Sequence, residues 1–358
     1  MKRGAWLGLA AVAMVIAGAW LLVRPPELPD DGSAAGPADS ATQATARRKL
    51  GAASVLAIDL RTGTRPAPPA RRSLFNDYLR SRNYRAMYER LKSSPEGQTP
   101  EGLYVLYDLL KRCAAITDRT SRQPLVRTAE QRRDEFVAGI PANDPQRGKR
   151  IAAFEDIAAN RCAGMEGISI RQADLDKLLV DSAALGDPKA QAYSLEQALW
   201  AERRAGGPDT RWGPGSVTVT DAQVATLRSL AASGDPEAMV IAGRVMSSAW
   251  HDFQVQVDDQ PVQRAAFNEA WQLLACEYGH PCDAGNARVQ AGCAYQGYCD
   301  AQSLPDFIYY YAASPNDSQL MARYREVLRD AILTGNWSQV NVARGLPDAN
   351  LWRPGSGG

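Results

Sequence analysis

The chain has 358 residues, of which 45% are hydrophobic and 23% charged, and its formal net charge is +1. This balance argues against nucleic acid as a partner, because nucleic-acid binding needs a basic face that displaces the counterions of the phosphate backbone. The mean hydropathy of −0.34 excludes a polytopic membrane protein.

The N-terminal segment predicts export. Residues 5–23 form a run without a charge or a proline, preceded by Lys2 and Arg3. As a helix, this run spans roughly 30 Å, about the thickness of the hydrocarbon core of a bilayer. The positive-inside rule then places the N-terminus in the cytoplasm and the rest of the chain in the periplasm, as in a single-pass inner-membrane protein. A cleaved signal peptide is the alternative, because residues 17–19 (Ala-Gly-Ala) have the small-residue pattern of a cleavage site.

The composition changes after this apolar run. Residues 25–72 are rich in Ala, Pro, Gly, Ser and Thr and lack a sustained apolar period. Such a segment cannot bury enough apolar surface to offset the entropy lost on ordering. We therefore expect a membrane anchor at 1–24, a flexible linker at 25–72, an α-helical domain at 73–345 and a flexible tail at 346–358.

Apolar residues recur at helical spacing from residue 73 onward. Thr99 and Pro100 suit the N-cap and the first position of a helix that runs to about residue 116. A further helix is expected to begin at Asp144 and to end at Gly164. Two short segments alternate like strands, and both are too short to build a sheet. The sequence therefore predicts an all-α fold, and the two segments are 216–220 and 253–257.

A short motif recurs in the second half of the chain. Residues 183–188 read Ala-Ala-Leu-Gly-Asp-Pro, and residues 231–236 read Ala-Ala-Ser-Gly-Asp-Pro, an offset of 48 (from 183 to 231). Fainter copies occupy residues 275–281 and 330–335. In each full copy, the glycine suits the left-handed conformation that ends a helix, the aspartate caps the next helix, and the proline begins it. The junction residues are Gly186, Asp187, Pro188, Gly234, Asp235, Pro236, Gly279 and Pro281.

This motif, Ala-Ala-x-Gly-Asp-Pro-x-Ala after a helix ending in Leu227 and Leu230, resembles the junction of Sel-one-like repeats. These repeats are a branch of the tetratricopeptide superfamily, and the resemblance covers about residues 180–300. The Leu-Gly-x-x-Tyr-x-x-Gly pattern usual in that family is absent from the following helices. The resemblance implies a solenoid of antiparallel helix hairpins that binds other proteins, often in bacterial envelopes, and it carries over no catalytic residue. An ordinary helical domain is the alternative.

Six cysteines, an even number, lie in the part of the chain that we expect to be exported. An oxidising compartment favours disulfides, although six cysteines permit 15 pairings. A spacing of six around a turn favours the pairs Cys276–Cys282 and Cys293–Cys299, and the remaining Cys113 and Cys162, both near the ends of predicted helices, could join two neighbouring hairpins. A zinc site formed by Cys276, Cys282 and His280, together with Cys293, is the alternative.

A run of aromatic residues is the candidate binding surface. Tyr309, Tyr310 and Tyr311 are consecutive, so as helical residues they point around the helix and cannot all face one core. Tyrosine is enriched at the centres of protein interfaces. If these residues form a binding surface, at least one ring should be largely exposed.

No catalytic motif is evident, and we expect neither a cofactor nor a metal. With two histidines in the chain, a hydrolase triad is hard to assemble. The available acidic pairs, Glu155-Asp156 and Asp258-Asp259, are expected to be solvated or to lie in a loop. We therefore expect a periplasmic scaffold that binds another envelope protein. The alternative is a cell-wall-acting hydrolase or lyase that uses an unrecognised carboxylate site.

Overall fold

The computed structural model of the chain describes residues 73–117, 129–165, 167–205, 217–248 and 253–344. The expected anchor at 5–23, the linker at 25–72 and the tail at 346–358 lie outside the described residues. No helix in these described ranges combines the length and the apolar character needed to cross a membrane.

The described residues are mostly helical, as predicted. The helices of the first half are α3 (Leu74–Arg80), α4 (Tyr84–Lys92), the 3₁₀ turn η1 (Pro95–Gln98), α5 (Pro100–Thr117), α6 (Ala129–Gly139), α7 (Arg147–Glu155), α8 (Ala158–Arg161), α9 (Gln172–Ala184) and α10 (Pro188–Ala205). Those of the second half are α11 (Asp221–Ala232), α12 (Pro236–Met246), α13 (Arg264–Glu277), α14 (Ala287–Gln296), α15 (Leu304–Phe307), the π-helical turn η3 (Ile308–Ala312) and α16 (Pro315–Thr334).

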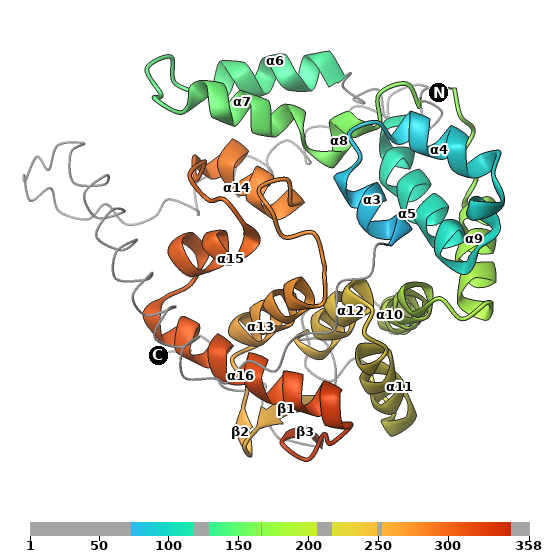
Figure 1. Cartoon of the computed structure of the whole chain (residues 1–358), viewed down its shortest axis with the longest axis vertical. Coiled ribbons are helices and arrows are strands. Elements are labelled where there is room, and N and C mark those ends of the chain that lie inside the picture. The colour runs from blue at the N-terminus through green and yellow to red at the C-terminus, as the bar shows by residue number, and fades with distance from the viewer. Residues whose placement is uncertain (1–72, 118–128, 166, 206–216, 249–252, 345–358) are drawn as a thin grey trace, which may run out of the picture. The chain divides into compact units, whose positions relative to one another are not determined.

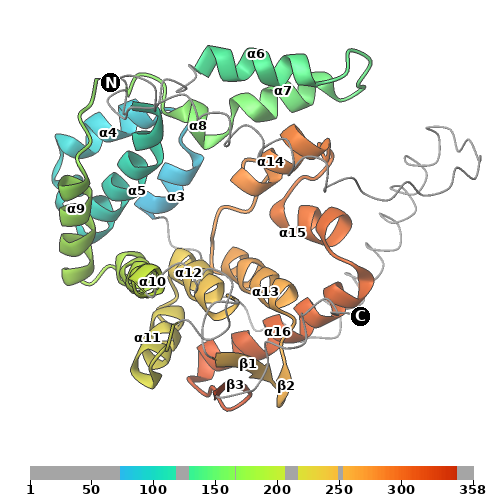
Figure 2. The same cartoon turned by 180° about the vertical axis from the view of Figure 1, so that it is seen from behind.

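One row of helices runs through the described residues. Helices α5, α9, α10, α12, α13 and α16 contact one another in that order, and α11 packs against α10, α12 and α16 (Figure 1 and Figure 2). Two apolar clusters lie along this row, one centred on Tyr78 and Leu109 and the other on Trp271 and Phe267. Such a row buries the apolar face that a single helix pair leaves open.

The two full junctions have the predicted local structure. Gly186 follows α9 with φ of +90°, and Gly234 follows α11 with φ of +80°. A side chain is strained in this left-handed conformation, which explains the glycines. The Oδ1 of Asp187 accepts the amide of Ala190 at 2.9 Å, and Asp235 caps α12 in the same way. Each proline begins its helix.

The fainter junction at 275–281 ends a helix but begins none. Gly279 has φ of +97° just after α13, whereas Pro281 lies outside any helix and α14 begins only after the N-cap Asn286. The disulfide between Cys276 and Cys282 explains this difference, because it ties the segment after Pro281 back to the end of α13.

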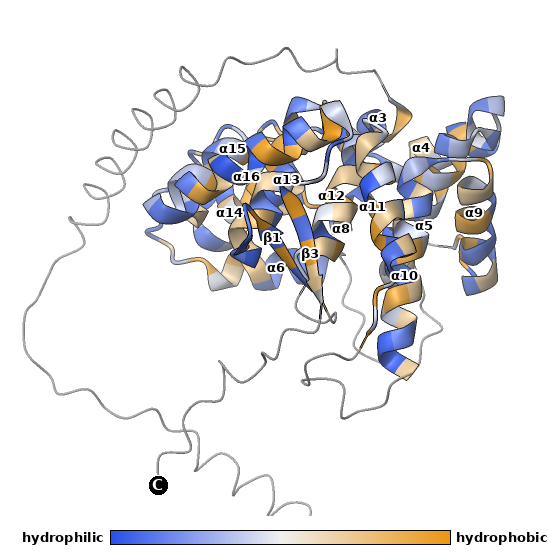
Figure 3. Ribbon diagram, turned by 90° about the horizontal axis from the view of Figure 1, so that it is seen from below, coloured by the Kyte–Doolittle hydropathy of each residue, from blue (hydrophilic) through white to orange (hydrophobic). Residues whose placement is uncertain are grey.

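A small sheet corrects the expectation that no sheet forms. Strand β1 (Phe253–Val257) pairs with β2 (Gln260–Pro261) and with β3 (Val340–Arg344), both antiparallel, and β1 and β3 lie side by side in Figure 3. Asp258 and Asp259 form the tight turn between β1 and β2, with φ of 53° and 60°. Strand β1 is too short to form a sheet by itself, but β3, which follows α16 in the chain, pairs with it.

The helix expected at 144–164 is interrupted, so that prediction was wrong. Helix α7 ends at Glu155, and Ile157 is extended before the short α8. Asn160 donates its side-chain amide to the carbonyl of Phe154 at 2.8 Å, which satisfies a carbonyl at the end of α7.

Three disulfides join the cysteines in the expected pairs. They are Cys113–Cys162, Cys276–Cys282 and Cys293–Cys299, and no free cysteine remains. The zinc alternative is therefore wrong, because the sulfur atoms that it requires are bonded to one another. Three disulfides in one chain are typical of an oxidising compartment.

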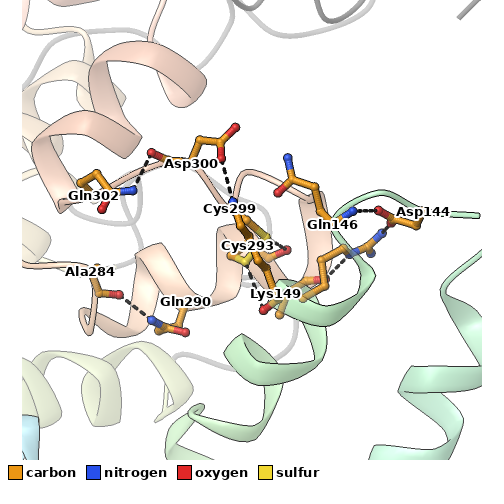
Figure 4. Close-up of a disulfide and its surroundings, with 11 residues drawn as sticks. Asp144, Gln146, Lys149, Ala284, Gln290, Cys293, Cys299, Asp300 and Gln302 are labelled. Atoms are coloured by element: carbon orange, nitrogen blue, oxygen red, sulfur yellow. Dashed lines mark hydrogen bonds and ion pairs between the residues drawn. A yellow bond between two sulfur atoms is a disulfide. The ribbon is translucent and has the colours of Figure 1, made fainter.

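The Cys293–Cys299 bond lies where α14 meets α7 (Figure 4). Lys149 of α7 lies 3.2 Å from Asp300, the residue after Cys299, and Arg150 donates to the carbonyl of Ala294 at 2.9 Å. The disulfide loop thus positions α14 against α7.

Candidate functional site

A polar cleft of about 440 Å³ lies between the ends of several elements. Its lining comes from the segment after α3, from α5, α12 and α13, and from the loop that leads into α14. The lining residues on which the chemistry depends are Tyr84, Arg112, Asp156, Glu237, His280 and Arg288. The volume is in the range of small-molecule sites, roughly 300–1,000 Å³.

A row of polar side chains crosses the helix starts beside this cleft. We call it the junction ladder, and it consists of Glu101, Asp187, Lys189, Asp235, Glu237 and His280. The Nζ of Lys189 lies 2.9 Å from Asp235, 3.1 Å from Asp187 and 3.7 Å from Glu101. Lys189 and Asp187 are both only 3% exposed. Burial lowers the pKa of Lys189, but the surrounding carboxylates outweigh this effect and raise it above the usual value. Lys189 is therefore charged.

Glu237 in α12 has the position that Lys189 has in α10, because each follows the proline that begins its helix. Its contact across the junction ladder is with His280, whose Nδ1 lies 3.7 Å from Oε2 of Glu237. That nitrogen is sealed from solvent and has no hydrogen-bond partner among the described residues. The ring as a whole lines the cleft, and the side chain of His280 is 13% exposed. The loop closed by the Cys276–Cys282 disulfide holds His280 in place.

Burial sets the protonation of this pair. It raises the pKa of Glu237 to about 8, a shift to which Asp108 contributes and which Arg112 opposes. It lowers the pKa of His280 to about 4, against the opposing charge of Asp235. At neutral pH the carboxyl group is therefore protonated and the imidazole is neutral. The part of the polar cleft that Glu237 and His280 line disfavours charge of either sign.

Ion pairs form another part of the lining of the polar cleft. Asp283 lies 3.4 Å from Arg80, and Asp156 lies 3.1 Å from Arg82. Asp156 also lies 3.5 Å from Arg161. The two carboxylates that line the cleft besides Glu237 are therefore already paired with arginines.

A second hollow, of about 360 Å³, lies beside α14 and shares Arg288 with the polar cleft. We call it the aromatic groove, and its aromatic lining is Tyr295, Tyr298, Phe307 and Tyr311. The rings of Tyr298 and Tyr311 are stacked with centroids 4.7 Å apart. Tyr295 is 58% exposed, and its ring packs edge-on against Phe136 and Phe154.

The structure places the three predicted tyrosines in η3, a π-helical turn. All three are half-buried, so no ring is as exposed as expected, and none is fully buried. Tyr309 and Tyr311 pack against the core, and only Tyr311 lines the aromatic groove. The exposed ring is Tyr295, which the sequence does not single out.

The acidic pairs have structural roles. Asp258 and Asp259 form the turn of the small sheet, as a loop was expected there, and Asp258 lies 2.8 Å from Arg323. Glu155 lies 2.6 Å from Arg133, and Asp156 joins the ion pairs at the polar cleft. Within the described ranges, no three His, Cys, Asp or Glu side chains converge as a metal site requires.

Sequence reasoning missed Glu237 and considered His280 only as a ligand of the alternative zinc site. A signal was present in the repeat, since the copies have Lys189 and Glu237 at one position, and Asp187, Asp235 and His280 at another. These changes replace an ion pair by an uncharged pair where the cleft is.

No protein-family model matches this chain, and neither the curated proteins nor the solved structures include a significant match to it. The likeness to Sel-one-like repeats therefore rests on the junction residues alone.

Proposed function

We propose that this protein is an exported helical-repeat module that binds another protein of the bacterial cell envelope through the aromatic groove. The observation that carries the proposal is Tyr295, a large ring that is 58% exposed yet fixed by its packing on Phe136 and Phe154. A rigid aromatic ring contributes contact area at little entropic cost, and tyrosine and arginine are the residues enriched at interface hot spots. Arg288 adjoins the groove.

The support of α14 favours this proposal. The helix packs on α7, and the disulfide Cys293–Cys299 ties the loop after α14 back to the helix, so the groove is preformed. The repeat resemblance and the disulfides support an envelope location, and a membrane anchor at 5–23 would keep the groove near the inner membrane.

Affinity purification from native envelope tests the proposal. The full-length chain is compared with Tyr295→Ser and with Leu185→Ser, a matched change of a 58% exposed side chain next to α9. We expect one protein to co-purify with wild type and with Leu185→Ser, and to be reduced at least about tenfold with Tyr295→Ser, the loss typical of a hot spot. Equal recovery with both variants would contradict the proposal.

A second candidate function is a hydrolase or lyase that acts on the cell wall. The observation that favours it is Glu237, whose pKa of about 8 keeps its carboxyl group protonated in a cleft, as a general acid must be. Binding remains the leading proposal, because Asp156 and Asp283 are held by arginines and leave no unpaired carboxylate to serve as the base. Release of soluble fragments from purified cell wall by wild type, and its loss in Glu237→Gln, would support the enzyme.

A further inference from the structure

The junction ladder changes its character where it meets the polar cleft. Lys189 and Asp235 form a closed ion pair at 2.9 Å, but the corresponding Glu237 and His280 stand 3.7 Å apart without a hydrogen bond. Glu237 and His280 line the cleft, whereas Lys189 and Asp235 do not. The position that the repeat fills with an ion pair in one unit is therefore occupied by an unbonded, uncharged pair where it lines the cleft.

The available hydrogen-bonding groups follow from the protonation of this pair. The sealed Nδ1 of His280 needs a donor, and the protonated carboxyl group of Glu237, whose Oε2 lies 3.7 Å away, can turn its proton toward it. The imidazole then carries its own proton on Nε2. One acceptor, the other carboxyl oxygen of Glu237, and one donor, Nε2–H of His280, remain for a ligand.

The part of the cleft that Glu237 and His280 line disfavours ionised ligands. The carboxyl group of Glu237 stays protonated although the cation Arg112 lies near it. The imidazole of His280 stays neutral although the anion Asp235 lies near it. Arg112, which also lines the cleft, is already paired with Asp108 at 2.6 Å, so an anion as well as a cation would lose its hydration here without gaining a free partner. An uncharged ligand that both donates and accepts hydrogen bonds avoids that cost.

The ion pairs that line the cleft indicate the class of ligand. Arg80 with Asp283, and Arg82 with Asp156, place guanidinium donors beside carboxylate acceptors. Each hydroxyl group of a sugar can both donate and accept a hydrogen bond, so adjacent hydroxyl groups can accept from the guanidinium group and donate to the carboxylate of such a pair. The N–H and C=O of a trans peptide group point in opposite directions, so one backbone group cannot address both members of a pair.

We propose that the polar cleft binds a neutral saccharide, with a hydroxyl group held between the carboxyl group of Glu237 and Nε2 of His280. This site is separate from the aromatic groove. It coincides with the site of the second candidate function, but binding does not require turnover.

The proton on Glu237 makes binding depend on pH. The charged or titratable groups that act on Glu237 and His280 are Tyr104, Asp108, Arg112, Asp235 and Arg244. Above pH 8, Glu237 ionises, and the ligand must then bury a carboxylate that has lost its proton. We expect affinity to fall as pH rises through 8, and we expect Glu237→Gln, which cannot ionise, to lose this dependence.

Ligand-observed saturation-transfer NMR on the full chain tests the proposal. The neutral probes are maltotriose and N-acetylglucosamine, the charged probes are glucuronate and glucosamine, and the peptide probe is N-acetyl-seryl-serinamide. The variants are Glu237→Gln, Glu237→Leu and His280→Phe, with Asp174→Asn on the exposed face of α9 as control.

We expect transfer to at least one neutral sugar with wild type, Asp174→Asn and, within a few-fold, Glu237→Gln. Glu237→Leu and His280→Phe should weaken binding at least about tenfold, as expected on loss of a buried hydrogen bond. Stronger binding of a charged probe or of the peptide, no binding of either neutral sugar, or equal binding by folded Glu237→Leu and His280→Phe would overturn the proposal. Normal sugar binding by Tyr295→Ser would show that the cleft binds sugar independently of the protein-binding function of the aromatic groove. Recovery of the sugar unchanged after the experiment would show that binding occurs without catalysis.

Discussion

The ammonium group of Lys189, in the first turn of α10, lies 2.9 Å from the carboxylate of Asp235, the N-cap of α12. One unit later, Glu237 of α12 faces His280 in the same relation, at 3.7 Å. The junction motif therefore does more than end and begin helices. It places a side chain of one helix start against the cap of the next, and that contact is an ion pair in one unit and an uncharged pair in the other.

The first prediction concerns the ion pair. Lys189→Met should lower the free energy of unfolding by about 3–5 kcal/mol, because it leaves the buried carboxylates of Asp187 and Asp235 without their partner. Lys177→Met, which removes an exposed pair with Asp181, should cost about 0.5 kcal/mol or less. Urea denaturation followed by circular dichroism measures both. Equal losses of unfolding free energy in the two variants would show that the buried ion pairs of Lys189 stabilise the fold no more than the exposed pair of Lys177.

The second prediction concerns the helix ends. Gly186→Ala should destabilise the protein by about 1–2 kcal/mol, because φ of +90° is strained for any residue with a Cβ atom. Gly148→Ala, inside α7 where a Cβ atom meets nothing, should stabilise it by up to about 1 kcal/mol. Thermal melts of the two variants compare one substitution in two backbone conformations, and a neutral Gly186→Ala would contradict the assigned turn.

The third prediction concerns the disulfides. Cys113–Cys162 closes a segment with a sequence separation of 49, whereas Cys293–Cys299 closes one of 6. In the chain-entropy account, their loss should cost about 4 and about 2 kcal/mol, respectively. Double Cys→Ser variants of each pair, compared in denaturant, measure the difference, and a larger loss for Cys293–Cys299 would contradict the expected order. Intact mass under non-reducing conditions should show two hydrogens fewer for each bond.

The fourth prediction concerns pH. The pKa of Glu237 is about 8 in the folded protein against 4.5 for a free glutamate, so its neutral form stabilises the fold fully below pH 4.5, and this contribution is lost as pH rises through 8. The pKa of His280 is about 4 against 6.5, so its contribution is present above pH 6.5 and is lost as pH falls towards 4. Between pH 4.5 and 6.5 the two slopes oppose each other, and between 6.5 and 8 only Glu237 acts.

Relative to wild type, Glu237→Gln should therefore gain stability as pH rises from 6.5 to 8.5, by on the order of 1–3 kcal/mol. Melting temperatures measured across this range for both proteins test the prediction. A difference that stays constant with pH would show that Glu237 is ionised throughout.

Local chemistry explains which parts of the fold the sequence predicted. Gly186, Asp187 and Pro188 act within one turn of chain, so their roles can be recognised without knowledge of the tertiary structure. Strand β1 could not be placed in a sheet, because its partner β3 begins at Val340, far along the chain.

The candidate site was harder to predict for the same reason. Glu237 and His280 come from α12 and from the loop after α13, and their meeting depends on how the hairpins stack. Tyr295 is one aromatic residue in a helix, and only its packing on Phe136 and Phe154, from α6 and α7, shows that its ring is fixed and exposed. The tyrosine run at 309–311 drew attention by its density, although the core takes up much of it.

The protein-binding role is tested most directly by photo-crosslinking in living cells. A benzophenone amino acid replaces Tyr295 in one full-length variant and Leu185, equally exposed beside α9, in another. Irradiation should yield one discrete adduct with an envelope protein from position 295 and none from position 185. No adduct from position 295, or the same adducts from both positions, would contradict the claim that the aromatic groove binds a protein partner.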